Sequence, residues 1–502
     1  MAILYYGADS TGTGVRIGIV DGTDSIIGNG VTIGSTDSSA MYLNTSALVT
    51  TSITVLGTVF GLNNAIYINS SDTVSVDLDI GSDGSVFSLD GDAIVVVGNS
   101  TNYQGRLILR NDGLIRGSDE GITAYYLDLI DIVNSGEISS SGIFPGNAAL
   151  SLIADVCQIT NTGVISSAND EAIELRTSFG IEGGEFELTN SGIIRGPSRA
   201  IYSDRRVDFI SNSGEIYGNL RLDISESATL DYADTVINTG LIVGDVELGF
   251  GDDLFDGANG SIFGTIDAGA GNDVIKSGIE DDLIIGGSGA DEMWGGAGID
   301  TASYEGSADG VRVSLNAGRG WFGDAQGDVL REIENLIGSD RRDTLIGNSA
   351  ANLIEGGNAD DVLNGLAGDD TLLGGNGADN ILGGTGNDYI SGDRHQDKLT
   401  GGSGEDIFAY LNILDSGPAQ SERDNITDFT QGQDLIDLTA LGDLNFGGSS
   451  FSGVAGEIIH YHVAGGTRTV VEIDTDGDSN ADFGILLSNA ALTMTAADFL
   501  FV

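Results

Sequence analysis

The sequence has almost no cysteine and little positive charge. Its one cysteine, Cys157, cannot form an internal disulfide, so no covalent bridge holds the fold together. Only 20 lysines and arginines stand against 76 aspartates and glutamates, and the formal net charge is −56. Such a chain would repel phosphate groups, which excludes nucleic acid as a partner and favours cations. The simpler alternative is an acidic surface suited to salt water, without a specific ligand.

Long apolar runs are also missing. A membrane-spanning helix needs about 20 mostly apolar residues in a row, and the chain has no such run. Residues 1–20 lack the pattern of a signal peptide, because Arg16 is their only basic residue and polar residues and glycines interrupt them. Any export is therefore expected to use another route. The apolar residues, 40% of the chain, occur in short alternating runs that favour buried β structure over disorder.

A degenerate repeat, in which Asn-Xaa-Gly precedes apolar residues, occupies the first half. The glycines of its clearest copies lie 22 to 29 residues apart, and the copies begin at Asn111, Asn134, Asn161, Asn190, Asn212 and Asn238. An apolar landmark keeps step with them at Met41, Ile66, Ile94, Ile122, Leu150, Ile173 and Ile201. Two landmarks with one period indicate one structural unit.

Short β-rich segments with Asn or Gly at their corners predict a right-handed parallel β-helix, or solenoid, over residues 1–247. About nine coils would stack, and each would bury its inward side chains only against its neighbours. We expect the corner Asn and Gly residues to supply positive φ. This stretch resembles, loosely, the parallel β-helix passenger regions of bacterial adhesins and secreted polysaccharide-acting proteins.

A sharper repeat of nine residues, G-G-x-G-x-D-x-U-x with U a large apolar residue, occupies two blocks of the second half. Four copies in residues 268–303 and an outlying copy in residues 248–256 place aspartate at the sixth position: Asp253, Asp273, Asp282, Asp291 and Asp300. Eight copies in residues 338–409 have Asn352 once at that position and otherwise carry Asp343, Asp361, Asp370, Asp379, Asp388, Asp397 and Asp406. Copies that stay in phase over such lengths exclude a simple glycine-rich linker.

These nonapeptides match the repeat-in-toxin (RTX) calcium-binding family, and the resemblance implies a parallel β-roll with each Ca²⁺ between loops two repeats apart. A run of n repeats then has n − 2 complete sites, which implies about six ions in the longer block and two in the shorter. Aspartate supplies a hard anionic oxygen, and glycines let the backbone aim its carbonyl oxygens inward. The glycines expected at the sites are Gly269, Gly271, Gly287, Gly289, Gly296, Gly298, Gly357, Gly368, Gly375, Gly377, Gly384, Gly386, Gly402 and Gly404. Glu280, Arg341 and His395 replace a fourth-position glycine, so the sites beside them should be weaker.

Residues 248–303 and 338–409 are thus expected to form two roll blocks, with spacer strands in residues 304–337 between them. Residues 410–502 resemble the carboxyl-terminal region of serralysin-type secreted proteins, on the evidence of the segments 424–429 (DNITDF) and 434–438 (DLIDL). This resemblance implies a small β-sandwich that continues the roll. The last residues, 496–502, resemble the uncleaved secretion signal of type I substrates, so the type I secretion apparatus is an expected partner.

A further candidate calcium loop lies near the carboxyl terminus. From Asp474 the chain alternates oxygen-bearing side chains, as calcium loops do, which makes Asp474, Asp476 and Asp478 candidate ligands. The loop lacks the distal glutamate of an EF-hand, and a solvated acidic turn is the alternative.

The expected function is that of a secreted calcium-binding protein of a Gram-negative bacterium, with about eight Ca²⁺ ions in complete sites. The roll should fold only after export, because crowded carboxylates repel one another without metal and the cytosol holds little calcium. We expect a structural or adhesive protein outside the cell or at its surface, in contact with cell-surface or matrix polysaccharide or with further copies of itself.

Enzymatic activity is not expected. The chain has no His-Glu-Xaa-Xaa-His of a zinc protease and no Gly-Xaa-Ser-Xaa-Gly elbow of a lipase. The alternative is a polysaccharide epimerase or lyase, since some such enzymes carry RTX repeats behind a β-helix. Arg199, Arg205 and Arg206 with Asp204 and Tyr202 could serve that chemistry, but we expect them to form ion pairs on a solvated face.

Overall fold

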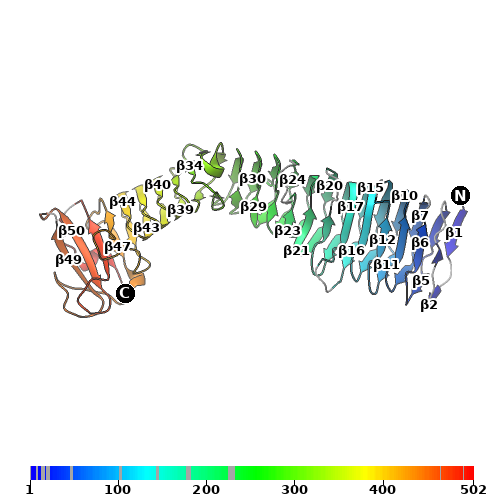
Figure 1. Ribbon diagram of the computed structural model, residues 1–502, viewed down its shortest axis with the longest axis horizontal. Helices are drawn as coiled ribbons and strands as arrows, with labels where there is room; N and C mark the ends of the chain where they lie inside the picture. Colours follow the sequence, from blue (N-terminus) through cyan, green and yellow to red (C-terminus); the bar gives the residue numbers. More distant parts are fainter. Residues whose placement is uncertain are drawn as a thin grey trace. The chain divides into compact units, whose positions relative to one another are not determined.

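The computed structural model describes residues 2–6, 10–12, 17–18, 23–45, 49–100, 104–142, 146–176, 183–223, 232–463, 465–489 and 491–501. The chain forms two compact units, Met1–Asp282 and Leu283–Val502 (Figure 1). The described residues contain β-strands, three short 3₁₀ helices and no α-helix, which confirms the predicted all-β fold. None of these helices is long and apolar enough to span a membrane. The last residue of the predicted secretion signal, Val502, lies outside the described residues.

The first unit is a parallel β-solenoid, in which each strand pairs with the equivalent strand of the next coil. The first sheet contains β1 (Ala2–Tyr6), β4 (Thr23–Ile27), β7 (Val49–Val55), β10 (Val74–Ile80), β13 (Gly105–Asn111), the second halves of β15 (Ile122–Asn134) and β17 (Leu150–Asn161), β20 (Glu185–Asn190), β22 (Val207–Asn212) and β24 (Thr235–Asn238). The second sheet contains β2 (Ser10–Gly12), β5 (Thr32–Ser35), β8 (Thr58–Gly61), β11 (Ser85–Ser88), β14 (Leu114–Gly117), β16 (Glu137–Ser140), β18 (Val164–Ser167), the first parts of β21 (Ile193–Ser203) and β23 (Glu215–Arg221), and β25 (Leu241–Val243).

The third sheet carries the apolar landmark of the sequence. It contains β3 (Ile17–Gly18), β6 (Met41–Thr45), β9 (Ile66–Ser70), β12 (Ile94–Val97), the first parts of β15 and β17, β19 (Ile173–Leu175), the ends of β21 and β23, and β26 (Val246–Glu247). The landmark residues lie directly opposite one another in this register and are all fully buried: Met41, Ile66, Ile94, Ile122, Leu150, Ile173 and Ile201. One apolar residue per coil thus builds one column of the core.

The corner asparagines of the repeat stack into a second column. The Asn side chains are buried, and each but the last donates from Nδ2 to Oδ1 of the Asn in the next coil at 2.7 to 2.8 Å, along Asn111, Asn134, Asn161, Asn190, Asn212 and Asn238. The expectation of positive φ at these corners is wrong, because neither these asparagines nor the glycines two residues later adopt it. The glycine is required for space instead, since a Cβ on Gly163 would overlap the carbonyl oxygen of Gly136 in the preceding coil.

The last coils of the first unit already contain nonapeptides. The first sheet continues through β27 (Leu254–Asp256) and β30 (Val274–Gly278), the second through β28 (Ser261–Phe263), and the third through β29 (Thr265–Asp267). Parallel pairing therefore crosses the expected boundary at residues 247 and 248 without interruption. The division of the chain into five segments stays a prediction.

The second unit is a β-roll whose two sheets take alternate nonapeptides. One sheet contains β31 (Leu283–Ile285), β33 (Thr301–Ser303), β37 (Asn335–Ile337), β39 (Leu353–Asn358), β41 (Thr371–Asn376), β43 (Tyr389–Arg394), β45 (Ile407–Ala409), β47 (Leu435–Asp437) and β52 (Phe499–Leu500). The other contains β34 (Arg312–Ser314), β38 (Thr344–Ile346), β40 (Val362–Ala367), β42 (Asn380–Thr385), β44 (Lys398–Ser403), β46 (Asp424–Ile426) and β51 (Phe483–Leu487). The eighth residue of every nonapeptide in residues 338–409 is fully buried between the sheets.

Shorter segments complete the second unit. In the spacer, β36 (Val329–Arg331) pairs with β32 (Glu292–Gly296) of the shorter block, and β35 (Arg319–Trp321) turns back against β34 before the 3₁₀ helix η1 (Gly323–Ala325). Near the carboxyl terminus, β49 (Glu457–Val463), β50 (Arg468–Asp474) and β51 form an antiparallel sheet, with β48 (Asn445–Phe446), η2 (Thr439–Leu441) and η3 (Ala496–Asp498) beside it. This sheet joins the roll through β46 and β51, as expected for a sandwich that continues it.

Candidate calcium sites

The sixth-position aspartates of the longer block form two ladders inside the roll. Each main-chain N–H at that position donates to Oδ1 of the residue two repeats later, at 2.7 to 3.0 Å. One ladder runs through Asp343, Asp361, Asp379 and Asp397, and the other through Asn352, Asp370, Asp388 and Asp406. All the aspartates are between 0% and 2% exposed. The 18-residue spacing of these bonds is the spacing that two nonapeptides predict.

The second carboxylate oxygen of these aspartates has no hydrogen-bond partner. Oδ2 of Asp361, Asp370, Asp379, Asp388, Asp397 and Asp406 is buried and accepts no hydrogen bond from any described residue. A buried anionic oxygen left in this state costs several kcal/mol unless a cation or a proton compensates it. The six oxygens therefore mark positions where a cation or a proton is needed to compensate a buried charge.

The first-position glycines create the space that these oxygens occupy. A Cβ on Gly383 would overlap Oδ2 of Asp388, and it would lie 2.5 Å from the carbonyl oxygen of Gly401 in the next coil. The same overlap with the aspartate recurs at Gly365, Gly374, Gly392 and Gly401. Carboxylate and carbonyl oxygens thus converge on one side of each loop. Hard oxygen atoms of these two kinds are the ligands that Ca²⁺ takes in proteins.

Most of the glycines expected at the sites adopt a left-handed backbone. Every one of them except Gly377 has positive φ, from 86° at Gly287 to 154° at Gly271. Four residues that replace a glycine of the repeat adopt it as well, Ala359, Leu366, Asp393 and His395, with φ from 59° to 88°, although such backbone is strained for a residue with a Cβ. The stacked loops therefore impose this conformation on most copies, even where glycine is replaced.

Burial raises the pKa of the ladder carboxyl groups. It raises the pKa of Asp370, Asp379, Asp388 and Asp406 to about 6, and that of Asp361 to about 8, where neighbouring carboxylates also contribute. The cause is the loss of water around an anion. In the absence of a cation these groups therefore keep protons close to neutral pH, and calcium would have to displace them.

The first two copies of the longer block differ from the rest. The Ser339 main chain donates to Oδ2 of Asp343 at 2.6 Å, and Asn352 donates from Nδ2 to the carbonyl oxygen of Glu334 at 2.7 Å. Their side chains are therefore satisfied by the protein itself. The oxygens without a hydrogen-bond partner begin only at Asp361.

The aspartates of the shorter block are also buried at their sixth positions. In the first unit, Asp253, Asp273 and Asp282 are between 1% and 3% exposed, and Asp253 N–H donates to Oδ1 of Asp273 at 2.7 Å. In the second unit, Asp291 and Asp300 are fully buried. The geometry of the ladder thus recurs outside the longer block.

Three buried aspartates that continue the ladders escaped the sequence analysis. Asp291 N–H donates to Oδ1 of Asp328 at 3.0 Å, Asp397 N–H to Asp424 at 2.9 Å, and Asp406 N–H to Asp434 at 3.2 Å. Asp328, Asp424 and Asp434 all lie outside the phased nonapeptides, and the full glycine pattern of the repeat is absent around them. The signal that could have identified them is the shorter pattern D-x-U-x, whose apolar member is fully buried at Ile426 and Ile436.

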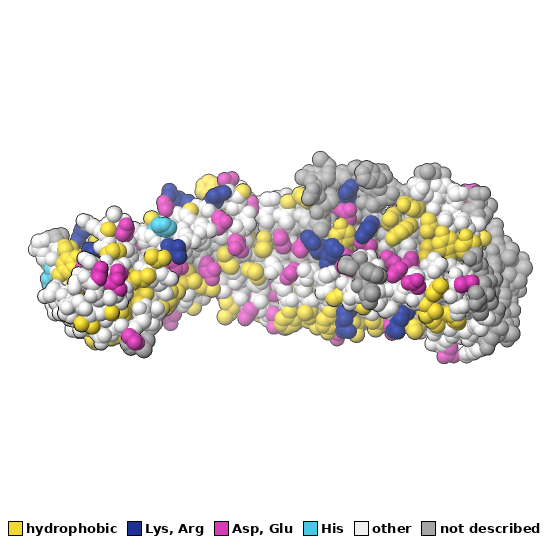
Figure 2. All heavy atoms as spheres, turned by 60° about the horizontal axis from the view of Figure 1, so that its bottom comes forward, with side chains coloured by type: hydrophobic (Ala, Val, Ile, Leu, Met, Phe, Trp, Pro, Cys, Tyr) yellow, Lys and Arg dark blue, Asp and Glu magenta, His cyan; other side chains and the backbone are white. Residues whose placement is uncertain are grey.

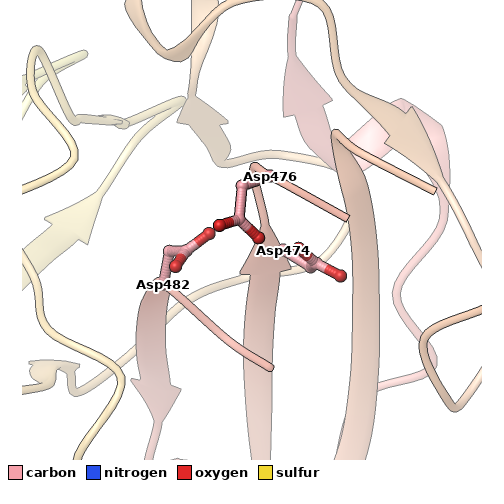
Figure 3. A group of neighbouring side chains, drawn as sticks. All are labelled: Asp474, Asp476 and Asp482. Atoms are coloured by element: carbon pink, nitrogen blue, oxygen red, sulfur yellow. The ribbon is translucent and has the colours of Figure 1, made fainter. Parts of the chain in front are cut away.

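The loop after β50 brings together a different set of aspartates from the one expected (Figure 3). Carboxylate oxygens of Asp474, Asp476 and Asp482 lie within 4.8 Å of one another. Asp478 is not part of this group, because it is exposed and accepts hydrogen bonds from Asn480. Asp482 takes its place, since it lies where the chain returns to β51 beside the end of β50. Both oxygens of Asp474 already accept main-chain hydrogen bonds from the loop.

The residues considered for acid–base chemistry are mostly engaged in the solenoid. Arg199 forms an ion pair with the buried Glu171 and lies 4.8 Å from the ring centre of Tyr202, while Arg205 lies 3.6 Å from Asp204. The expectation of a solvated face is wrong for Arg206, which is 1% exposed. Its side chain extends into the solenoid and donates to the carbonyl oxygen of Arg176 at 3.1 Å.

Two sequence families match the chain. Residues 267–302 match the RTX calcium-binding nonapeptide repeat, and residues 292–501 match the family described as Peptidase M10 serralysin C terminal. The match to the nonapeptide repeat identifies an RTX protein. The second match shows that this RTX protein has a serralysin-like carboxyl-terminal region. RTX repeats bind calcium and are typical of secreted proteins.

Solved structures with detectable likeness include two subunits of the mannuronan C5-epimerase of Azotobacter vinelandii. The AlgE6R3 subunit is 29% identical, with 31% of this chain and 80% of that chain covered and a TM-score of 0.23. The AlgE6R2 subunit is 26% identical, with 34% and 92% covered and a TM-score of 0.21. No curated protein sequence gave a significant match.

Proposed function

We propose that this protein is a secreted structural or adhesive protein whose β-roll folds around Ca²⁺ after export. The observation that carries this proposal is the row of six buried Oδ2 atoms, in residues 361–406, that accept no hydrogen bond. Each lies where a first-position glycine leaves space, and beside Asp361, Asp370, Asp379 and Asp388 a glycine carbonyl oxygen of a neighbouring loop approaches the same space. A divalent cation at each loop would satisfy these oxygens and neutralise the buried charge.

The proposed ligands are the oxygens of the sixth-position aspartates and the carbonyl oxygens of the glycine loops in both blocks. Asp328, Asp424 and Asp434 extend this set, and Asp474, Asp476 and Asp482 form a separate candidate site. The chain's own residues supply the loop conformation and the anionic oxygens. A bound Ca²⁺ would supply the compensating charge and link each loop to the loop two repeats later.

The energetic effect of calcium depends on its concentration. At 1 mM Ca²⁺ and a dissociation constant of about 10⁻⁴ M, each site contributes about 1.4 kcal/mol. About eight such sites would together contribute roughly 11 kcal/mol, which is comparable to the whole stability of a typical domain. At the far lower calcium concentration of the cytosol this contribution vanishes. Folding would therefore follow export by the type I route.

The solenoid is proposed to carry the contact with other molecules. An open groove follows the corners of four successive coils, along residues 191–193, 213–215, 239–241 and 259–261, and its lining is mostly glycine and small polar residues. Figure 2 shows acidic side chains scattered over the face in view, with bands of hydrophobic side chains along the solenoid. A groove that repeats from coil to coil suits an extended, repetitive partner such as a cell-surface or matrix polysaccharide.

Circular dichroism of the full chain, with chelator and with 1 mM Ca²⁺, tests the calcium-dependent fold. We expect a large gain of β signal on addition of calcium, and we expect hydrogen exchange to place the new protection in the roll strands β38 to β45. A roll that is equally protected in chelator would refute the proposal. Fractionation of producing cells into surface and medium, with and without chelator, tests the extracellular role. Turnover of acidic polysaccharides by the purified chain would favour an enzyme instead.

A further inference from the structure

A row of core residues in the first sheet of the solenoid changes from apolar to acidic along the stack. In four successive coils the row consists of buried Leu107, Ile130, Cys157 and Phe186, which lie directly opposite one another. The next residue in the same register is Asp208, opposite Phe186. The next two coils thus carry aspartate where the four earlier coils carry an apolar side chain. Asp208 lies in β22, and Asp234 immediately precedes β24. We call Asp208, Asp234, Asp253 and Asp273 the carboxylate row.

The carboxylate row has the hydrogen bonds of the ladders in the roll. Asp208 N–H donates to Oδ1 of Asp234 at 2.8 Å, and Asp234 N–H donates to Oδ1 of Asp253 at 2.6 Å. Asp253 N–H donates in turn to Asp273 at 2.7 Å. The first two members precede all nonapeptides, and no glycine pattern announces them. They share only D-x-U-x with the repeats, and the apolar member is fully buried at Ile210 and Val236.

The two leading aspartates carry buried oxygens that the protein does not satisfy. Asp208 and Asp234 are each 1% exposed. Both oxygens of Asp208 and Oδ2 of Asp234 accept no hydrogen bond from the described residues. Oδ2 of Asp234 is thus in the state of Oδ2 in the roll, and its Oδ1 accepts a main-chain N–H in the same way, whereas Asp208 has neither oxygen bonded. An apolar residue at either position would avoid the cost of burying a charge, as the four preceding coils show.

Protein cations do not balance the carboxylates at this place. Asp208 and Asp234 interact electrostatically with each other and with the buried Asp223 and Asp253. Among the described residues, the buried cation nearby is Arg206, whose charge acts on Asp208 but whose hydrogen bonds go to main-chain carbonyls. One guanidinium cannot neutralise four carboxylates. Burial raises the pKa of Asp208 to about 7 and that of Asp234 to about 10, so protons would occupy the site when no cation does.

We propose that a divalent cation binds between Asp208 and Asp234 inside the solenoid. The ligands are carboxylate oxygens, which indicates that the cation is Ca²⁺. The series of calcium sites would then begin two coils before the first nonapeptide. This inference rests on the proposed function, because it takes the ion of the roll to be Ca²⁺. Its consequence is that calcium orders the end of the solenoid as well as the roll. The solenoid would stay open at β22 and β24 until the chain meets calcium.

The test uses the full chain with Asp208→Asn and Asp234→Asn combined. Asn keeps Oδ1 at position 234 as the acceptor of the Asp208 N–H, and the two substitutions remove both negative charges. Bound calcium is counted by equilibrium dialysis and elemental analysis, and hydrogen exchange is followed in β22 and β24. We expect the double variant to lose one ion and the calcium-dependent protection of these strands, while the roll strands β40 to β44 keep theirs. Asp252→Asn is the matched control, because Asp252 is exposed beside Asp253, and it should behave as the wild type.

The outcomes separate this inference from the proposed function. An unchanged ion count with unchanged protection of β22 and β24 would overturn the inference alone, provided that calcium still protects the roll. No bound calcium in the wild type, and no protection anywhere, would overturn both. If circular dichroism shows that the double variant does not fold, Asp208→Leu replaces it, because the preceding coils bury apolar residues in this row. The same loss of one ion is then expected, and retention of that ion refutes the site.

Discussion

The substitution Asp379→Asn tests whether the ladder carboxylates act as calcium ligands or only as hydrogen-bond acceptors. Oδ1 of Asp379 accepts the N–H of Asp361 at 2.7 Å, and Oδ2 is buried without a hydrogen-bond partner among the described residues. Asn preserves the acceptor at Oδ1 and the size of the side chain. It removes the charge that Oδ2 would offer to a cation.

The expected effect of the substitution on stability depends on calcium. Burial raises the pKa of Asp379 from 3.8 to about 6, and this shift corresponds to about 3 kcal/mol against the ionised folded state at pH 7. Without calcium the variant should therefore be more stable than the wild type. At 1 mM Ca²⁺ the variant should lose the two calcium sites to which Asp379 would contribute. Each site stabilises the folded wild type by about 1.4 kcal/mol. Calcium should therefore cancel the advantage of the variant, because the two lost sites, about 2.8 kcal/mol together, nearly equal the roughly 3 kcal/mol gained without calcium.

Hydrogen exchange of β41 and β42 measures this loss of the variant's advantage within the roll, in chelator and at several calcium concentrations. Asp369→Asn is the matched control, since Asp369 is exposed in the same block. We expect the control to follow the wild type in both conditions. Destabilisation of the Asp379→Asn variant by the same amount in chelator and in calcium would refute the reasoning, because the carboxylate would then act through packing or hydrogen bonding alone.

Three further predictions concern pH, space and the asparagine column. Because of the raised pKa values, the folded roll binds protons more tightly than the unfolded chain does. Without calcium, the stability of the roll is therefore greatest below about pH 4 and falls as the pH rises through about 6. Calcium competes with those protons, so calcium titrations at pH 7 and pH 5 should show weaker binding at pH 5, and equal affinities would contradict this. Gly383→Ala should weaken calcium binding in such a titration, because the new Cβ would overlap Oδ2 of Asp388. Gly448→Ala is the control, since a Cβ at Gly448 meets no atom within 4 Å, and it should leave calcium binding unchanged. Equal affinities for the two variants would refute the proposal that calcium binds in this space. Asn161→Ala should destabilise the solenoid by about 2 to 4 kcal/mol in urea unfolding, because it leaves buried partners at Asn134 and Asn190, and a change below about 1 kcal/mol would argue against the column.

The sequence predicts the roll in detail because each nonapeptide specifies its own place. A spacing of nine residues sends alternate copies to opposite sheets, so the sixth position faces inward at every copy and the eighth fills the core. The positions of Asp361 and Leu363 therefore follow from the repeat without knowledge of the tertiary structure. The apolar landmark of the solenoid is predictable for the same reason, since one residue per coil must meet its equivalent in the next coil.

Residues outside the phased nonapeptides could be assigned to the ladders only through the tertiary structure, because the short pattern D-x-U-x does not by itself specify burial. Asp328, Asp424 and Asp434 join the ladders from segments of irregular length, and their place depends on which strand stacks on which. The corner asparagines are visible in the sequence, but only the stacking of coils shows that their amides bond to one another rather than shape a left-handed turn.

By itself, then, the sequence determined the all-β architecture, the two kinds of repeat and the ligand chemistry of the nonapeptides, because periodic residues carry their own register. Only the tertiary structure decided where each ladder begins and ends, and which oxygens the protein leaves unsatisfied. Asp208, Asp234 and Arg206 are the clearest cases. Nothing in their local sequence distinguishes a buried charge from a surface one, because burial depends on the register between coils that are distant in the chain.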